Sequence, residues 1–115
     1  MAFHFLSHPW EVRYVSDGIV VACTRKDLDA MTVPALVDEL HDLVLENGVP
    51  NLYLDFARVD NMASAVVGKL LALDARLRKV GGRLSLRNVD PALYEALRGC
   101  VGDSLEMHMS EYQPV

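Results

Sequence analysis

Several features are scarce or missing in this 115-residue sequence, and each absence excludes a class of protein. Only two residues are cysteines, and without a CxxC spacing they form neither a disulfide framework nor a zinc-finger pattern. Apolar neighbours surround both, so Cys23 and Cys100 are predicted to be buried free thiols. The first ten residues have no basic segment followed by an apolar run, and no run approaches the roughly 18 apolar residues of a membrane span. We therefore expect a cytoplasmic protein without a membrane-inserted segment.

Basic residues are fewer than acidic ones, 11 against 16, which gives a formal net charge of -5. This balance gives no general attraction for nucleic-acid phosphates or anionic membranes. Six basic residues do gather within one predicted helix and the strand after it. No aromatic residues alternate with them, so a protein partner fits this segment better than a nucleic acid does. The six are Lys69, Arg76, Arg78, Lys79, Arg83 and Arg87.

Sequence signatures of enzymes are missing as well. The chain has no GxxxxGK[ST] loop, no GxGxxG after a strand and no GxSxG turn. Its four histidines show no metal-binding spacing with one another or with the cysteines. Asp27 and Asp29 form a carboxylate pair, but no partner base accompanies them. We therefore expect no enzyme, no metal site and no cofactor.

What the sequence does contain fits a single domain, residues 1–115, with a core from about residue 10 to residue 110. No linker, repeat or low-complexity tract divides it. Hydrophobic residues make up 51% and charged residues 23%, which is enough apolar material for a core without disulfides. A hairpin is predicted first, with strands at 10–15 and 19–24 around Ser16-Asp17-Gly18.

Helices and strands then alternate, which predicts an α/β fold with parallel central strands. Apolar residues at helical spacing, together with Gly48 and the Gly81-Gly82 pair as stop signals, set the helix limits. The segment 25–30 is expected to be a loop. The expected helices are 33–47, 64–80 and 91–98, and the expected strands are 52–56, 83–87 and 104–109.

Two predicted strands show that the sheet has one packed face and one face in water. Leu52 and Leu54 alternate with Tyr53 and Asp55, and Leu84 and Leu86 alternate with Arg83, Ser85 and Arg87. A parallel sheet covered on both faces would instead be apolar throughout. We therefore expect a mixed sheet with the helices mainly packed on one face, and with Tyr53 and Asp55 pointing away from them. The helix 64–80 is predicted to bury the stripe Val66, Leu70, Leu73, Leu77 and Val80.

The same helix carries Asp74 and Arg78 four residues apart, the spacing of a helical ion pair. Because both are predicted to lie on its solvated face, the pair is expected to be weak.

The region 51–82 carries the most informative pattern: an apolar strand, Val59-Asp-Asn-Met62, then Ala63-Ser-Ala-Val-Val-Gly68 and a helix ending in Arg78-Lys-Val-Gly-Gly82. With Leu28-Asp-Ala-Met-Thr-Val-Pro34 upstream, this layout resembles the STAS domain, the fold of bacterial anti-sigma factor antagonists. In that family a strand leads into a loop reading Met-Asp-Ser-Ser/Thr-Gly-Leu-Gly, which opens a helix. The upstream Leu-Asp-x-x-Thr element is matched at Leu28, Asp29 and Thr32.

Within the loop, Met62 and Gly68 match the family, and Ser64 falls on the serine that family members offer to a partner kinase. Ala63 replaces the usual aspartate, Ala65 the second hydroxyl residue and Val66 the first glycine. A serine at a helix start also fits a second role, that of an N-cap accepting a backbone N–H bond.

The resemblance implies a protein-binding module that binds an anti-sigma factor with serine kinase activity and is switched by phosphorylation of Ser64. The implied partner surface comprises Asp29, Asn61, Met62, Ala63, Ser64 and Ala65. The alternative is a STAS scaffold without phosphorylation, or a subunit associated with a transporter, and a weak homodimer is left open. Neither the phosphorylation switch nor the scaffold interpretation implies binding to nucleic acid.

Overall fold

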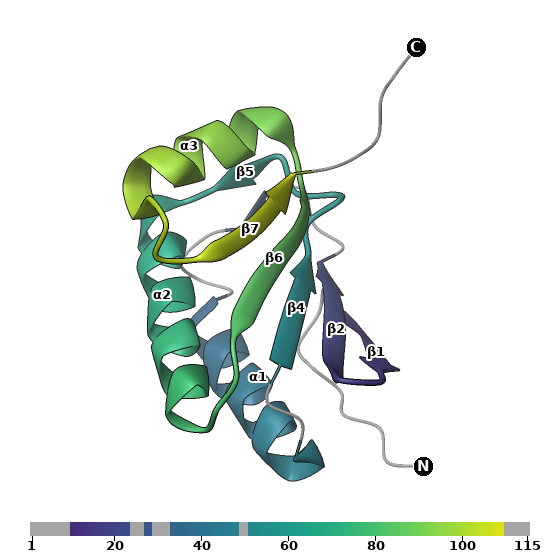
Figure 1. Ribbon diagram of the computed structural model, residues 1–115. Coiled ribbons are helices and arrows are strands. Elements are labelled where there is room, and N and C mark those ends of the chain that lie inside the picture. The colour runs from purple at the N-terminus through teal and green to yellow at the C-terminus, as the bar shows by residue number, and fades with distance from the viewer. Residues whose placement is uncertain (1–9, 24–26, 29–32, 49–50, 110–115) are drawn as a thin grey trace.

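The computed structural model describes residues 10–23, 27–28, 33–48 and 51–109 (Figure 1). A hairpin comes first, and helices then alternate with strands in the predicted order. The elements are β1 (Trp10–Val15), β2 (Gly18–Cys23), β3 (Asp27–Leu28), α1 (Val33–Asn47), β4 (Asn51–Asp55), β5 (Asn61–Met62), α2 (Ser64–Lys79), β6 (Leu84–Val89), α3 (Pro91–Val101) and β7 (Glu106–Met109).

The main sheet has the strand order β1-β2-β4-β6-β7. β1 and β2 pair antiparallel, whereas β2, β4, β6 and β7 pair parallel, so the prediction of a mixed sheet with parallel central strands is confirmed. A separate two-stranded sheet joins β3 to β5. This small sheet was not predicted, and β3 lies in the segment 25–30 that was expected to be a loop.

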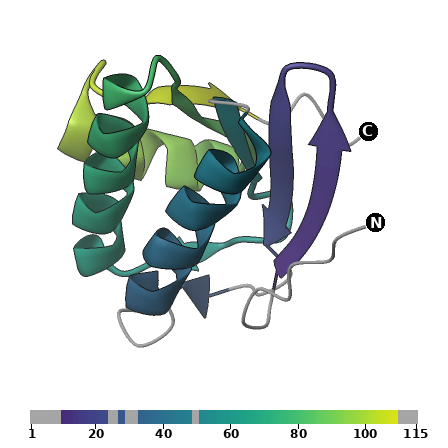
Figure 2. The same cartoon turned by 90° about the horizontal axis from the view of Figure 1, so that it is seen from below.

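The two faces of the main sheet differ as the alternation predicts. In β4, Leu52 and Leu54 are fully buried, while Tyr53 and Asp55 are only half-buried and line a hollow on the opposite face. α1 and α2 lie side by side along the packed face, and α3 crosses near the upper end of the sheet (Figures 1 and 2). The helices therefore pack mainly on one face.

All three helices contribute to a single hydrophobic core. α1 contributes Leu40, Leu43 and Val44, α2 contributes Val66, Leu70, Leu73 and Leu77, and α3 contributes Leu93, Leu97 and Val101. These side chains meet the buried residues of β2, β4 and β6. In the described part of the chain, none of the helices combines the length and apolarity needed to cross a membrane.

Two details of the predicted helices are wrong. α2 ends at Lys79, so Val80 occupies the C-cap and is 46% exposed instead of completing the buried stripe. α3 runs three residues beyond the predicted end, to Val101, and its buried stripe is Leu93, Leu97 and Val101.

Of the two cysteines, only Cys23 lies in the core. Cys100 is off the buried stripe of α3 and is exposed, so its predicted burial is wrong. No disulfide joins Cys23 to Cys100, as the sequence predicts.

The basic residues between 69 and 87 do not form one surface. Arg76 pairs with Asp38 of α1, and Arg87 lies over the Tyr53 ring on the open face of the sheet. Arg78 and Arg83 both contact the carboxylate of Asp74, which is buried. The expectation that Asp74 lies on the solvated face of α2 is therefore wrong.

Candidate functional site

Five of the predicted partner-binding residues lie together between β5 and the first turn of α2, and we call them the Ser64 patch. β4 ends at Asp55, a short turn follows, and β5 leads directly into the helix (Figure 1). Asn61, Ala63, Ser64 and Ala65 are exposed and Met62 is half-buried. Asp29, the sixth predicted residue, lies outside the described residues.

The patch is held in place by hydrogen bonds to β3. The backbone N–H of Ala63 donates to the carbonyl of Leu28 across 2.9 Å, and the Asn61 side-chain amide donates to Asp27 Oδ1, also across 2.9 Å. Met62 is the register partner of Leu28 and packs against the core. The segment immediately before Ser64 is therefore held by a backbone hydrogen bond at Ala63, a side-chain hydrogen bond at Asn61 and the packing of Met62.

The structure corrects the N-cap role suggested for Ser64. Ala63 occupies the N-cap position, with an extended backbone (φ -65°, ψ 145°) and no side-chain hydrogen bond to the helix, and Ser64 is the first residue of α2. By contrast, α3 has a capping side chain, because Asp90 accepts from the N–H groups of Ala92 and Leu93. Among the described residues, no side chain accepts from the first N–H groups of α2, and the Val66 N–H donates to the backbone carbonyl of Ala63.

The Ser64 hydroxyl is exposed and forms no hydrogen bond with any residue that the structure describes. It stands at the positive end of a 16-residue helix, where negative charge is favoured. Its neighbours in the patch carry no charge, because they are an asparagine, a methionine and two alanines. The arrangement presents an accessible hydroxyl among uncharged side chains, with the Asp27 carboxylate beside Asn61. Among the described residues, no group lies in position to activate the hydroxyl as a nucleophile.

Asp27 is the residue of this site whose role the sequence did not reveal. It was considered only as half of a carboxylate pair with Asp29, whereas the structure uses it to hold Asn61. Across the described ranges, no three His, Cys, Asp or Glu side chains are grouped as metal ligands would be.

The comparisons with known proteins agree with this architecture. Residues 24–100 match the family model described as "Mlab, STAS domain". No curated protein sequence gives a significant match.

Three solved structures illustrate the fold likeness. The anti-sigma factor antagonist SpoIIAA in its unphosphorylated form is 21% identical with a TM-score of 0.68, over 89% of each chain. A variant of RsbS from Moorella thermoacetica is 19% identical with a TM-score of 0.71, over 88% of this chain and 86% of that one.

The third is the murine anion transporter Slc26a9, which is 16% identical with a TM-score of 0.65 over 85% of this chain. The match covers 17% of the transporter chain. The family model spans well over half of the 115 residues, and this chain therefore belongs to the STAS domain family.

Proposed function

We propose that this STAS domain is an anti-sigma factor antagonist. It binds an anti-sigma factor with serine kinase activity through the Ser64 patch, releases the sigma factor held by that partner, and is undocked when Ser64 is phosphorylated. One observation carries the proposal: the Ser64 hydroxyl is exposed at the start of α2 and has no hydrogen-bond partner among the described residues, and the N-cap Ala63 offers no side-chain acceptor. The domain acts in the cytoplasm by binding alone.

A phosphate on Ser64 suits the fold. Phosphate groups bind well at helix N-termini, where free N–H groups and the helix dipole favour negative charge. The Val66 N–H donates to the Ala63 carbonyl, but the side chain of Ala63 accepts no hydrogen bond, which leaves the N–H groups of Ser64 and Ala65 for the phosphate oxygens. The modified domain is therefore expected to stay folded.

The same phosphate opposes docking. It adds about two negative charges to a surface built from neutral side chains. A partner that covers the patch would have to remove those charges from water, which is costly without a matching cation. Binding and phosphorylation therefore alternate.

The comparisons support this proposal at the level of the fold. SpoIIAA, whose structure this chain resembles, is an anti-sigma factor antagonist, and its form from Bacillus has been determined in the phosphorylated state. The formal net charge of -5 also favours a protein partner over nucleic acid.

The decisive experiment is phosphate transfer from the cognate kinase. The kinase is first identified by pull-down from the native host and mass spectrometry, and is then incubated with the domain and radiolabelled ATP. We expect label on the wild-type domain and none on Ser64→Ala. Ser104→Ala, which removes an exposed hydroxyl elsewhere on the molecule, should be labelled like wild type. Equal labelling of Ser64→Ala and wild type would refute the assignment.

A second function is a STAS subunit that docks constitutively, as a scaffold or on a transporter. Two observations favour it: Ala63 and Val66 stand where the family loop has an aspartate and its first glycine, and the fold also resembles part of an anion transporter. Recovery of transport proteins instead of a kinase in the pull-down, with no label on Ser64, would select this function.

A further inference from the structure

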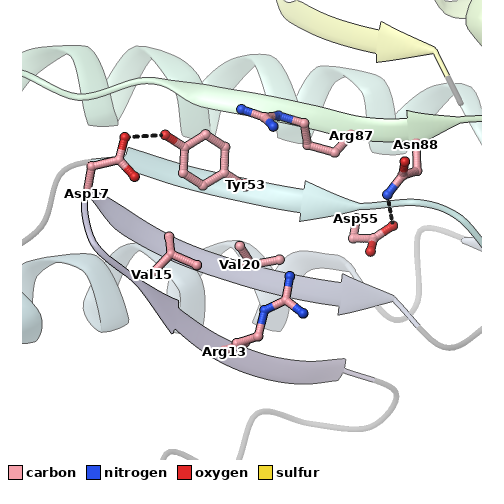
Figure 3. Close-up of a pocket in the computed structure, with 8 residues that line it drawn as sticks. All are labelled: Arg13, Val15, Asp17, Val20, Tyr53, Asp55, Arg87 and Asn88. Carbon is pink, nitrogen blue, oxygen red and sulfur yellow. Dashed lines mark hydrogen bonds between the residues drawn. The ribbon is translucent and has the colours of Figure 1, made fainter. Parts of the chain in front are cut away.

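The open face of the main sheet holds a hollow of about 420 Å³ that the STAS function above does not use. Its lining comes from β1, β2, β4 and β6 and from the turn between β1 and β2, on the face opposite the helices (Figure 3). This volume lies within the usual range of small-molecule sites, about 300–1,000 Å³. Val15 and Val20 provide the apolar part of the lining.

Four charged side chains share this hollow, and none of them pairs with another. Arg13 and Arg87 are the cations, and Asp17 and Asp55 are the anions. Asp55 and Arg87 are register partners on adjacent strands, where opposite charges usually attract each other. The structure gives them separate partners instead, and Arg13 contacts no carboxylate among the residues that are described.

Separate partners hold the charged groups of Arg87, Asp17 and Asp55 in place. The Arg87 guanidinium lies 4.5 Å from the centre of the Tyr53 ring, and the Tyr53 hydroxyl donates to Asp17 Oδ2 across 2.9 Å. Asp55 Oδ1 accepts from the Ala57 N–H at 3.0 Å and from the Asn88 side chain at 3.1 Å. Each carboxylate keeps a second oxygen, and each guanidinium keeps N–H groups, for another molecule.

Two further features keep this arrangement in place. Burial, followed by the hydrogen bond to Asp17, raises the pKa of Tyr53, so its hydroxyl remains a donor at neutral pH. Asn88 has a positive φ of 55° at an irregularity between β6 and β7, a conformation that costs a non-glycine residue energy. That conformation accompanies the hydrogen bond of Asn88 to Asp55.

We propose that the hollow binds a small zwitterion: a molecule whose acidic group meets Arg87, whose amino group meets Asp55, and whose short carbon chain covers Val15 and Val20. The two cations and two anions give the lining no net charge, so it offers little to a simple anion or a simple cation. A molecule that carries both charges satisfies both kinds of side chain at once. Charge-assisted hydrogen bonds of this kind are the stronger ones in proteins.

The test uses matched six-carbon and five-carbon probes, titrated into the ¹⁵N-labelled domain and followed by NMR. Leucine and 6-aminohexanoate carry both charges, close together in the first and far apart in the second. Hexanoate carries only the acid and pentylamine only the amine. We expect at least one zwitterion to bind about tenfold more tightly than both single-charge probes, because it gains one more charge-assisted hydrogen bond. Its shifts should concentrate on β1, β2, β4 and β6.

Three substitutions locate the site. Arg87→Gln and Asp55→Asn each remove one charge while keeping a similar shape, and both should abolish the advantage of the zwitterion. Arg58→Gln, which removes an exposed guanidinium outside the hollow, should leave it intact. Thermal unfolding of each variant verifies that it is folded.

Three results would overturn the proposal. The first is that neither zwitterion exceeds both single-charge probes. The second is that Arg58→Gln weakens binding as much as Arg87→Gln does. The third is that Arg87→Gln weakens binding of the protein partner while no zwitterion binds, which would make the open face a protein interface. The kinase experiment on Ser64 is independent of these outcomes.

Discussion

Asp74 Oδ1 accepts a hydrogen bond from the backbone N–H of Leu84 across 2.9 Å. This contact ties the last turns of α2 to the start of β6, on either side of the turn that reverses the chain. The same carboxylate lies 2.9 Å from Arg78 Nε and 3.3 Å from Arg83 Nε. A buried carboxylate needs such partners, because its charge has been removed from water. Asp74 is thus an anchor of the fold.

Replacing Asp74 with alanine should destabilise the domain by about 2–3 kcal/mol, since it leaves the buried Leu84 N–H without an acceptor. Asp74→Asn keeps an acceptor for that N–H but loses the charge, so a smaller loss is expected. Arg76→Ala breaks only the exposed pair with Asp38 and should cost less than about 1 kcal/mol. Urea unfolding of the three variants measures these differences. A loss for Asp74→Ala no larger than for Arg76→Ala would contradict the anchoring role.

The buried stripe of α2 gives a second prediction. Leu70 is 1% exposed in the core, so Leu70→Ala should cost about 2–5 kcal/mol, the usual range for emptying a leucine site. Lys69 precedes it on the exposed side of the same helix, and Lys69→Ala should change stability by less than about 0.5 kcal/mol. Similar unfolding midpoints for the two variants would show that the wrong face of α2 had been assigned to the core.

Glu106 gives a pH-dependent prediction. Its hydrogen bond with His108, and to a lesser degree the one from Ser85, lower the pKa of its carboxyl group. The unfolded chain then binds this proton more readily, so the stabilisation is complete above the unfolded pKa of about 4.3 and is lost as the pH falls through the folded value.

Wild type should therefore exceed Glu106→Gln in stability at pH 7, and this small difference should shrink by pH 3. Urea unfolding at both pH values, with the exposed Glu95→Gln as control, measures it. A difference that stays constant between the two pH values would be inconsistent with the lowered pKa.

Much of the fold was predictable because periodicity records burial. Leu52, Leu54, Leu84 and Leu86 alternate with polar residues, and this pattern identified both the strands and the uncovered face of the sheet. The two-residue strands β3 and β5 were missed because a pair of residues has no period to detect.

The polar contacts were less predictable, because they depend on tertiary structure. Nothing in the local sequence distinguishes Asp74, which is buried by β6, from an ordinary surface aspartate. In the same way, Arg87 belongs to a basic run in the sequence but reaches the open face, because β6 directs it away from the helices. The loop pattern indicates the Ser64 patch. Only the backbone geometry shows that the N-cap position belongs to Ala63 and that Ser64 is the first residue of the helix.

The missing cap of α2 gives a direct prediction for Ala63. Its extended backbone already suits an N-cap, so Ala63→Ser should stabilise the domain by about 1 kcal/mol through a new bond to a free N–H group. Ala65→Ser places the same hydroxyl inside the first turn, where it cannot cap, and should not raise stability. Thermal unfolding compares the two. If both variants match wild type, the N-terminal N–H groups of α2 are already satisfied and the basis for phosphate accommodation is lost.

Ser64→Glu separates the stability of the helix from the docking of a partner. A carboxylate in the first turn of α2 should stabilise the domain by about 0.3–1 kcal/mol relative to Ser64→Gln, which has the same shape without the charge. In partner binding the order should reverse, because the charge must be desolvated when the Ser64 patch is covered. Binding of both variants to the identified partner, measured by calorimetry, tests this opposition. If Ser64→Glu binds as tightly as Ser64→Gln, negative charge at this position does not undock the partner, and constitutive docking replaces the phosphorylation switch.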